Sequence, residues 1–156
     1  MKSAARILSL LLLLSFSVGT AAPEGGSTAA GPEPTAYTAK ASFSKAVERL
    51  PAPERAAMLG LQPPPKYPEK WRAWGKPAYA IVVLIVDQYG NAEKAQCTEA
   101  TDRAFARTAE TAAEDWFFMP ALSRQQAVNS KITVRVDFES PTKVTMQIVM
   151  APVPSR

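Results

Sequence analysis

The residue types that could perform chemistry are few in this chain of 156 residues, which has no histidine and one cysteine, Cys97. Without histidine, a Ser-His-Asp triad, a Cys-His pair and imidazole ligands for zinc are excluded, and one thiol forms no internal disulfide. The carboxylate candidates are Asp87, Glu114 and Asp115. Neighbouring carboxylates on a helix point apart, whereas acid–base catalysis needs two that converge. With no glycine-rich phosphate loop and no calcium-type acidic loop, the sequence predicts no catalytic site, metal or cofactor.

Residues 66–76 are a second chemical candidate, because they interleave four cations with the rings of Tyr67, Trp71 and Trp74. Such rings can stack on a sugar or, together with the cations, hold a polyanion. Alternatively, Trp71 and Trp74 cover a sheet while the lysines extend into solvent. We favour the second interpretation. The first one leaves a cell-wall or glycan-binding module as an alternative function.

The charge distribution gives no sign of nucleic-acid binding. The chain carries 18 Lys and Arg against 14 Asp and Glu, and the basic excess is not concentrated in one stretch. Electrostatic binding of nucleic acid needs a basic stripe. We therefore expect no nucleic-acid partner.

The N-terminus has the pattern of an export signal. Lys2 and Arg6 precede a leucine-rich run over 7–18. Small residues follow this run: Gly19, Ala21 and Ala22. The run is shorter than the roughly 20 residues of a membrane span, so we predict that residues 1–21 are a cleaved signal peptide. The alternative is an uncleaved anchor, and only in that case do we expect contact with the membrane.

The next part of the chain is irregular. Residues 22–43 are rich in Pro, Gly, Ala, Ser and Thr, which predicts a flexible leader. Residues 44–61 predict a short helical segment: one turn that Pro51 ends, then a second helix over 54–59 that Gly60 ends. Residues 62–68 form a proline-rich connector, which we expect to be extended.

From residue 78 the hydrophobic pattern predicts a core. Residues 78–86 are nearly all apolar and β-branched, which predicts a strand, and a turn containing Gly90 leads to a partner strand over 92–98. Thr101 or Asp102 can cap an alanine-rich helix that runs to about Trp116. Alternating apolar residues predict two more strands, over 128–138 and 143–150.

Together these elements predict an α+β fold. Its parts are a small antiparallel sheet with a β-β-α-β core, an added C-terminal strand and short N-terminal helices, with the main domain over residues 62–150. We expect Phe105, Trp116 and Phe118 in the core, and Cys97 as a small buried side chain rather than a reactive thiol.

The first strand has a second apolar row that needs a cover: Tyr79, Ile81, Val83 and Ile85. An exposed patch of this kind is uncommon on a monomer. Either residues 44–61 cover it, through Val47, Leu50, Met58 and Leu61, or a second copy does. We favour residues 44–61, and the chain is then a monomer, with a homodimer as the alternative.

The strand over 143–150 would be the last in its sheet, so its outer backbone groups would lack partners. An extended peptide can bind such an edge as one more strand. Lys143, Thr145 and Gln147 are then candidate partner-binding residues. Alternatively, Lys143, Pro141 and Pro152 block the edge, and the pattern alone leaves both possibilities open.

Several motifs together resemble the C-terminal domain of TonB-type energy transducers. They are Ile85-Val86-Asp87-Gln88-Tyr89-Gly90-Asn91, an alanine-rich helix ending at Trp116, Phe118-Met119-Pro120-Ala121, and a strand ending Val136-Asp137-Phe138. Tyr67-Pro68 ahead of a short helix matches the entry motif of the family. The resemblance covers about residues 62–138.

This resemblance implies a non-enzymatic periplasmic domain that pairs a strand with a short segment of an outer-membrane receptor. Gln62-Pro63 with Tyr67-Pro68 resemble the receptor-contact motif of the family, with two extra residues between the pairs, so these four residues are candidate contacts. Family members carry a membrane helix and a long spacer, whereas this sequence has a signal-like N-terminus and a short leader. We expect an exported periplasmic module that binds an outer-membrane receptor or envelope protein. A short energy transducer with an uncleaved anchor is the alternative.

Overall fold

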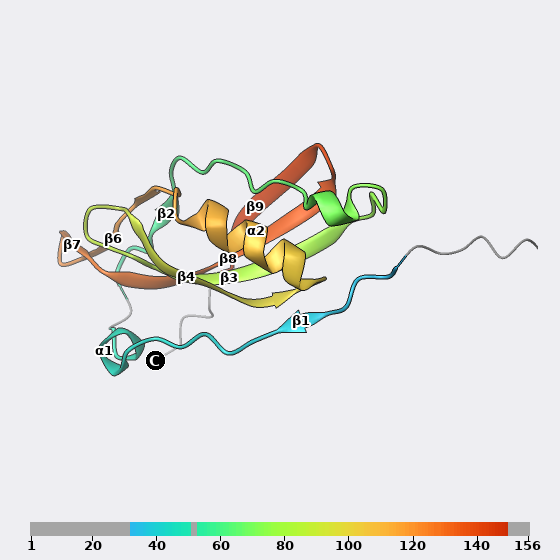
Figure 1. Cartoon of the computed structure of the whole chain (residues 1–156). Coiled ribbons are helices and arrows are strands. Elements are labelled where there is room, and N and C mark those ends of the chain that lie inside the picture. The colour runs from blue at the N-terminus through green and yellow to red at the C-terminus, as the bar shows by residue number, and fades with distance from the viewer. Residues whose placement is uncertain (1–31, 51–52, 150–156) are drawn as a thin grey trace, which may run out of the picture. The chain divides into compact units, whose positions relative to one another are not determined.

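A five-stranded antiparallel sheet positions the other elements of the protein. The computed structural model describes residues 32–50 and 53–149, which belong to one compact unit. The strands lie in the order β1-β4-β3-β8-β9 (Figure 1), with the bounds Tyr37–Thr38, Ala92–Ala100, Ala78–Val86, Ser130–Ser140 and Lys143–Val149. The helix α2, Arg103–Ala113, lies between β4 and β8 in chain order. The predicted α+β fold with a β-β-α-β core and an added C-terminal strand is confirmed.

Shorter elements complete the described chain. β2 (Met58–Leu59) pairs with β5 (Phe118–Met119), and β6 (Ala121–Ser123) pairs with β7 (Gln126–Val128). The helix α1 has only four residues, Lys45–Glu48, and the 3-10 helix η1 spans Glu69–Trp71. Of the helices in the described residues, none is long and apolar enough to cross a bilayer.

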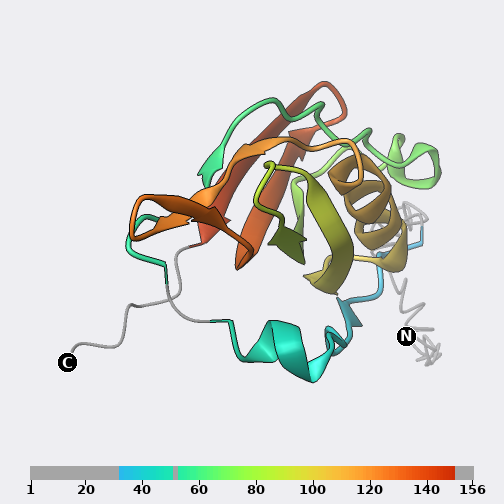
Figure 2. The same cartoon turned by 90° about the vertical axis from the view of Figure 1, so that its left-hand side faces the viewer.

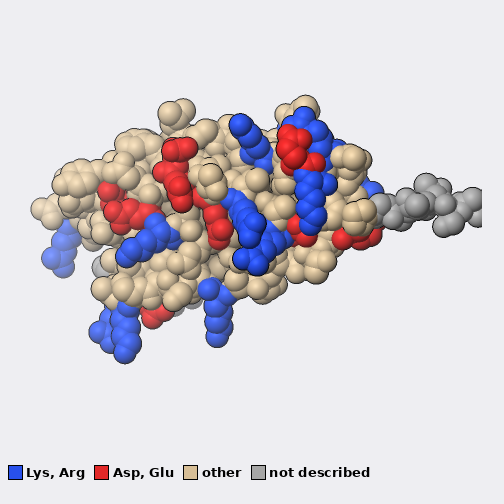
Figure 3. Space-filling view, viewed as in Figure 1, with Lys and Arg blue, Asp and Glu red and all other residues tan. Residues whose placement is uncertain are grey.

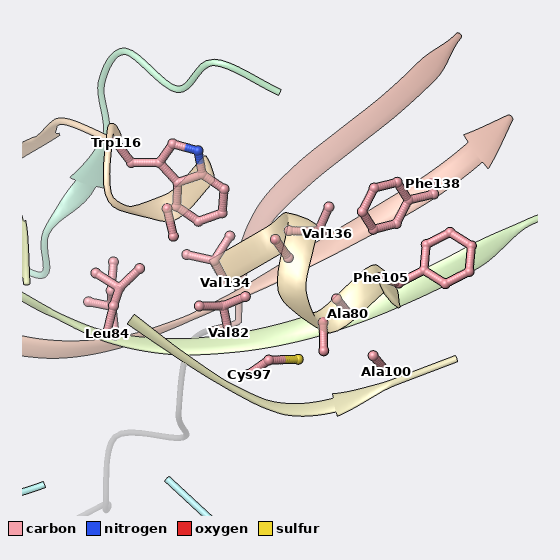
Figure 4. Close-up of a cluster of buried hydrophobic side chains, with 14 of the residues drawn as sticks. Ala80, Val82, Leu84, Cys97, Ala100, Phe105, Trp116, Val134, Val136 and Phe138 are labelled. Atoms are coloured by element: carbon pink, nitrogen blue, oxygen red, sulfur yellow. The ribbon is translucent and has the colours of Figure 1, made fainter. Parts of the chain in front are cut away.

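The core lies between the sheet and α2. Ala80, Val82 and Leu84 of β3 point to this face and are fully buried, as is every second residue of β8 from Val134 to Phe138. Figure 4 shows Phe105 and Trp116 beside these strand residues. Phe105, Trp116 and Phe118 are all buried, which confirms the three predicted core residues.

A bulge in β4 lets Cys97 and Ala100, three residues apart, both point into the core. The register with β3 shifts here, because Ile81 pairs with Glu99 while its neighbour Val82 pairs with Cys97. The extra residue changes which side chains face inward. Cys97 is 2% exposed, and burial raises the pKa of its thiol to about 11. The prediction of a buried Cys97 is confirmed.

The turn between β3 and β4 requires glycine at position 90. Gly90 has a φ of +95°, and its carbonyl oxygen accepts a hydrogen bond from the Phe118 N–H at 2.7 Å. A Cβ here would clash with the Phe118 carbonyl oxygen. The turn therefore also fixes the chain that follows α2.

The described part of the predicted flexible leader lies along the edge of β4. Tyr37 and Thr38 pair with Ala100 and Glu99, so β1 is an edge strand of the sheet. Ser42 and Gln96 exchange two hydrogen bonds, of 2.6 and 3.0 Å. These hydrogen bonds offset the loss of conformational entropy when this segment becomes ordered, which its few apolar side chains could not offset by burial. Residues 22–31 and the predicted signal peptide, residues 1–21, lie outside the described residues.

The predicted second helix over residues 54–59 is wrong. Arg55 instead forms a bridge with Leu122, and Met58–Leu59 pair with β5. The extended backbone completes hydrogen bonding with the chain after α2, and it buries Ala57. Six residues have little helical stability of their own, so these long-range bonds decide the conformation.

The second apolar row of β3 is partly covered by the chain itself. Ile85 is buried, and Ile81 and Val83 are half-buried. In both views α1 lies on the side of the sheet opposite α2 (Figures 1 and 2). Val47 of α1 and Leu50, which follows it, are half-buried. The expected contribution of Met58 and Leu61 is wrong: β2 pairs with β5, and these two side chains are exposed.

Asp102 joins three segments at the start of α2. Its carboxylate accepts hydrogen bonds from the Ala104 N–H at 2.9 Å, the Trp71 Nε1 at 2.9 Å and the Thr35 N–H at 3.4 Å. Burial of this carboxylate raises its pKa, but these bonds and the Lys70 ammonium at 3.7 Å outweigh burial, so the pKa of Asp102 is lowered. The ionised form therefore stabilises the fold.

We expect Asp102→Ala to destabilise the protein by about 2–4 kcal/mol. It removes a helix cap, worth about 1 kcal/mol, and leaves the buried Trp71 Nε1 without its acceptor, at about 1–3 kcal/mol. Because the folded pKa is depressed, the stabilisation by charge is complete above the unfolded pKa of about 3.9 and is lost as pH falls through the folded pKa. Urea denaturation at neutral and acidic pH measures both effects.

Asp102→Asn is the matched control for this experiment, because it keeps a capping oxygen and removes the charge. Its stability should fall less than that of the wild type on acidification. Equal acid sensitivity of the two proteins would contradict the role given to the carboxylate charge.

The thiol of Cys97 should react slowly in the native protein. With a pKa of about 11, only about one thiol in a thousand is ionised at pH 8. We expect reaction with Ellman's reagent to be at least about 100-fold slower than in denaturant, where one thiol per chain should react rapidly. A native rate close to the denatured rate would show that Cys97 is accessible.

Candidate peptide-binding site

The two edges of the main sheet are covered differently. β1 occupies the edge of β4, whereas β9 pairs with β8 and has no backbone partner on its other side among the described residues. The seven residues of β9 contain no proline, and their one charge is on Lys143, at the start of the strand. β2 lies close to β9, but no backbone hydrogen bond among the described residues joins the two strands. The unpaired N–H and C=O groups of β9 can therefore accept a further strand.

The side chains of β9 alternate between two environments. Val144, Met146 and Ile148 are half-buried against the core, whereas Lys143, Thr145 and Gln147 are exposed on the opposite face. The structure thus places the three predicted partner-binding residues in one row. This row lies next to the unpaired edge.

Hydrogen bonds with β8 hold this exposed row. Lys143 forms an ion pair with Glu139, which lowers the pKa of the Glu139 carboxyl. Thr145 Oγ1 donates to Glu139 Oε1 at 3.3 Å, and Gln147 Nε2 donates to Asp137 Oδ2 at 3.4 Å. These bonds therefore give the row a defined arrangement.

The polar row continues across the sheet from β8 to β4. Arg135 Nε donates to Asp137 Oδ1 at 2.8 Å, and the Arg135 guanidinium lies 4.8 Å from the centre of the Tyr79 ring. The Tyr79 hydroxyl donates to Glu99, and this hydrogen bond raises the pKa of Tyr79. These contacts give the face opposite α2 a polar surface at this end of the sheet.

The proline-rich connector packs against the core through Tyr67. The Tyr67 ring lies 5.1 Å from Phe105 and 6.1 Å from Phe138, edge-on to both, and its hydroxyl donates to the Lys76 carbonyl oxygen at 2.9 Å. Burial raises the pKa of this hydroxyl. Pro68 is buried as well. The side chains of these two predicted contacts therefore pack within the fold.

Gln62 and Pro63 attach the other end of the connector to the chain after α2. Gln62 Nε2 donates to the Phe117 carbonyl oxygen at 3.1 Å, and the Pro63 carbonyl oxygen accepts from Trp116 Nε1 at 3.1 Å. The Pro63 side chain is exposed, while that of Gln62 is partly buried. These bonds hold the connector alongside α2.

Two hollows lie beside the connector. One, of about 380 Å³, lies between the connector and the β8–β9 hairpin, and its lining includes Pro65, Lys66, Tyr67, Arg72, Lys143 and Val144. The other, of about 420 Å³, lies against α2, and its lining includes Pro63, Lys66, Arg107 and Asp115. The first hollow therefore brings Tyr67 and Lys143 together. Gln62, Thr145 and Gln147 line neither hollow.

Sequence reasoning missed Lys66, Arg72 and Val144 as parts of one site. Residues 66–76 stand out by their composition, but no local pattern indicates that they lie beside the β8–β9 hairpin. That proximity follows from Tyr67, which holds the connector over Phe138 of β8.

The aromatic residues of segment 66–76 belong to the fold. Trp71 is 2% exposed and donates its Nε1 to Asp102, and Trp74 is half-buried with its ring 6.0 Å from that of Trp71. The interpretation that these rings cover the sheet is confirmed for Trp71. A buried ring offers no stacking surface for a sugar.

Acidic and basic side chains are interspersed on the face seen in Figure 3. Within residues 32–50 and 53–149, no three Asp, Glu or Cys side chains gather as they would around a metal ion. The open edge of β9 and the adjoining hollow are thus the features that suit a ligand.

Comparison with known proteins places the chain in a family. Residues 63–140, half of the chain, match the family model described as Gram-negative bacterial TonB protein C-terminal. The solution NMR structure of the Pseudomonas aeruginosa TonB C-terminal domain matches with a TM-score of 0.42 and 21% identity, over 64% of this chain and 90% of that chain. A search of the curated proteins gives no match. On the family match, the chain belongs to the TonB C-terminal family and carries a protein-interaction module of the TonB type.

Proposed function

We propose that the protein is an exported, non-enzymatic periplasmic module that binds an extended segment of an outer-membrane receptor, or of another envelope protein, as an added strand along β9. The unpaired outer edge of β9 is the observation that carries this proposal. Membership of the TonB C-terminal family supports a protein partner. Main-chain hydrogen bonds would supply affinity, and the alternating side chains of β9 would supply specificity.

The opposite edge of the same sheet illustrates the binding mode. There β1, an extended segment of the chain itself, pairs with β4, and the half-buried Tyr37 packs against the core. A partner strand on β9 would likewise place every second side chain beside Val144, Met146 and Ile148. Association and ordering costs offset much of this gain, so a short peptide should bind with a Kd on the order of micromolar.

The exported location rests on the sequence of residues 1–21. A charged start, a leucine-rich run and small residues form the pattern of a signal peptide. The periplasm is also where domains of this family act. These two observations support the same compartment.

Binding can be measured with peptides of about 12 residues that cover the periplasm-facing N-terminal segments of outer-membrane receptors from the same cell. We expect at least one peptide to bind the mature protein with a Kd on the order of micromolar. N-methylation of the bound peptide should then abolish binding at alternate residues, because every second N–H of a strand faces its neighbour.

A methylation pattern without this alternation, or no binding by any peptide, would contradict strand addition at β9. The control is a peptide of the same composition in scrambled order. It keeps the charge and hydropathy but loses the matched alternation of side chains.

Export can be tested on the protein produced in a Gram-negative cell. We expect N-terminal sequencing of the periplasmic fraction to find a chain beginning near Ala22, because the apolar run is short and small residues follow it. A chain that begins at Met1 and sediments with the membrane would contradict export by cleavage, and would favour the anchored transducer.

A further inference from the structure

The hollow between the connector and the β8–β9 hairpin carries a positive charge. Lys66, Arg72 and Lys143 are among its lining residues, and none of the lining residues is acidic. Two carboxylates outside the lining pair with these cations: Glu69 with Arg72 at 2.7 Å, and Glu139 with Lys143. Lys66 forms no ion pair within the described ranges. Three cations against two carboxylates leave a net positive charge.

Both ion pairs can give way to an incoming anion at small cost. The side chains of Arg72 and Glu69 are 60% and 79% exposed, and those of Lys143 and Glu139 are 66% and 42% exposed. Pairs this exposed are screened by water and salt and contribute little to stability. The guanidinium of Arg72 also has several N–H donors, so it can hold Glu69 and a second carboxylate together.

The position of this hollow at the start of β9 determines which end of a bound strand would reach it. Lys143 and Val144, the first two residues of β9, line it. A strand bound antiparallel to β9 therefore ends at the hollow with its C-terminus, whereas a parallel strand begins there with its N-terminus. Directly opposite residues of paired strands lie about 4.5–5.5 Å apart, so the residue opposite Val144 reaches the hollow.

The second hollow does not offer the same site. Its lining includes the acidic residue Asp115 as well as the cations Lys66 and Arg107. It also lies against α2, away from the edge of the sheet. A strand along β9 would not extend into it. The arrangement of positive charge at the start of an open edge is specific to the first hollow.

We propose that this first hollow is an anion subsite for the C-terminal end of the bound strand. On the proposed function, on which this inference rests, the partner segment runs antiparallel to β9. It carries a carboxylate where it meets Lys66, Arg72 and Lys143. That carboxylate is either the α-carboxylate of a chain end or the side chain of an Asp or Glu.

Three versions of one β9-binding peptide, chosen from the receptor-derived set, separate these sources. The first ends in Gln with a free α-carboxylate, the second in Glu with a C-terminal amide, and the third in Gln with a C-terminal amide. We expect at least one acidic version to bind about threefold to tenfold more tightly than the neutral third version. This preference should shrink at high salt, because the cations are exposed. The tighter of the two acidic versions identifies the source of the carboxylate.

Substitution of residues that line the hollow tests whether the hollow causes the preference for acidic peptides. Arg72→Gln and Lys143→Gln should each reduce the acidic-to-neutral ratio of affinities by about threefold, while binding of the neutral peptide stays within about twofold. Lys131→Gln is the matched control, because Lys131 is an exposed lysine of β8 paired with Ile85, at the other end of the strand from Ser140 and Lys143. It should leave the ratio unchanged.

Direction is measured with a spin label on either end of the peptide. A label at the C-terminal end should broaden the amide resonances of Thr142 and Lys143, and a label at the N-terminal end should broaden that of Val149. Equal affinities of the three peptides, an unchanged ratio in Arg72→Gln and Lys143→Gln, or the reverse broadening overturns the anion subsite while strand addition stands. Failure of every peptide to bind overturns both proposals.

Discussion

Backbone hydrogen bonding at the edges of a sheet is the constraint on which this structure depends. Every open sheet has two outer strands whose N–H and C=O groups need partners. Here the chain supplies one partner itself: Tyr37–Thr38 and the Ser42–Gln96 pair lie along β4. The other outer strand, β9, has none among the described residues. On the proposed function, an extended partner would therefore pair with β9 rather than with β4.

The remaining elements hold β9 in its place at the edge of the sheet. α2 and the connector that contains Tyr67 cover one face of the sheet. On the other face, side-chain contacts join neighbouring strands, from Gln147 through Asp137 and Arg135 to Tyr79. Asp102 fixes the start of α2 and, through Trp71, the position of η1. Because η1 follows the connector directly, the same contacts place Lys66 and Arg72 beside the first residues of β9.

Local patterns predict much of this fold and less of the site. The alternation in β8, the apolar run of β3 and the Asp102 cap are properties of adjacent residues, so the core strands, α2 and buried Trp116 follow from the sequence. The pairing of Met58–Leu59 with β5 and the docking of β1 depend on partners 59 to 63 residues away, which no local pattern encodes. The bulge in β4 depends on its register with β3, 15 to 18 residues away, and the alternation within β4 does not indicate it. For the same reason the sequence predicts Lys143, Thr145 and Gln147 as candidate contacts but does not indicate that Lys143 lies near Lys66 and Arg72.

Amide hydrogen exchange along β9 tests the central claim most directly. In the free protein, the amides of β9 that point away from β8 should exchange rapidly, while the amides that donate to β8 are protected. Addition of a binding peptide should protect the outward amides at every second residue from Lys143 to Val149 and leave β4 unchanged. Protection that arises along β4 instead, with release of β1, or that leaves β9 unaffected, would contradict the account.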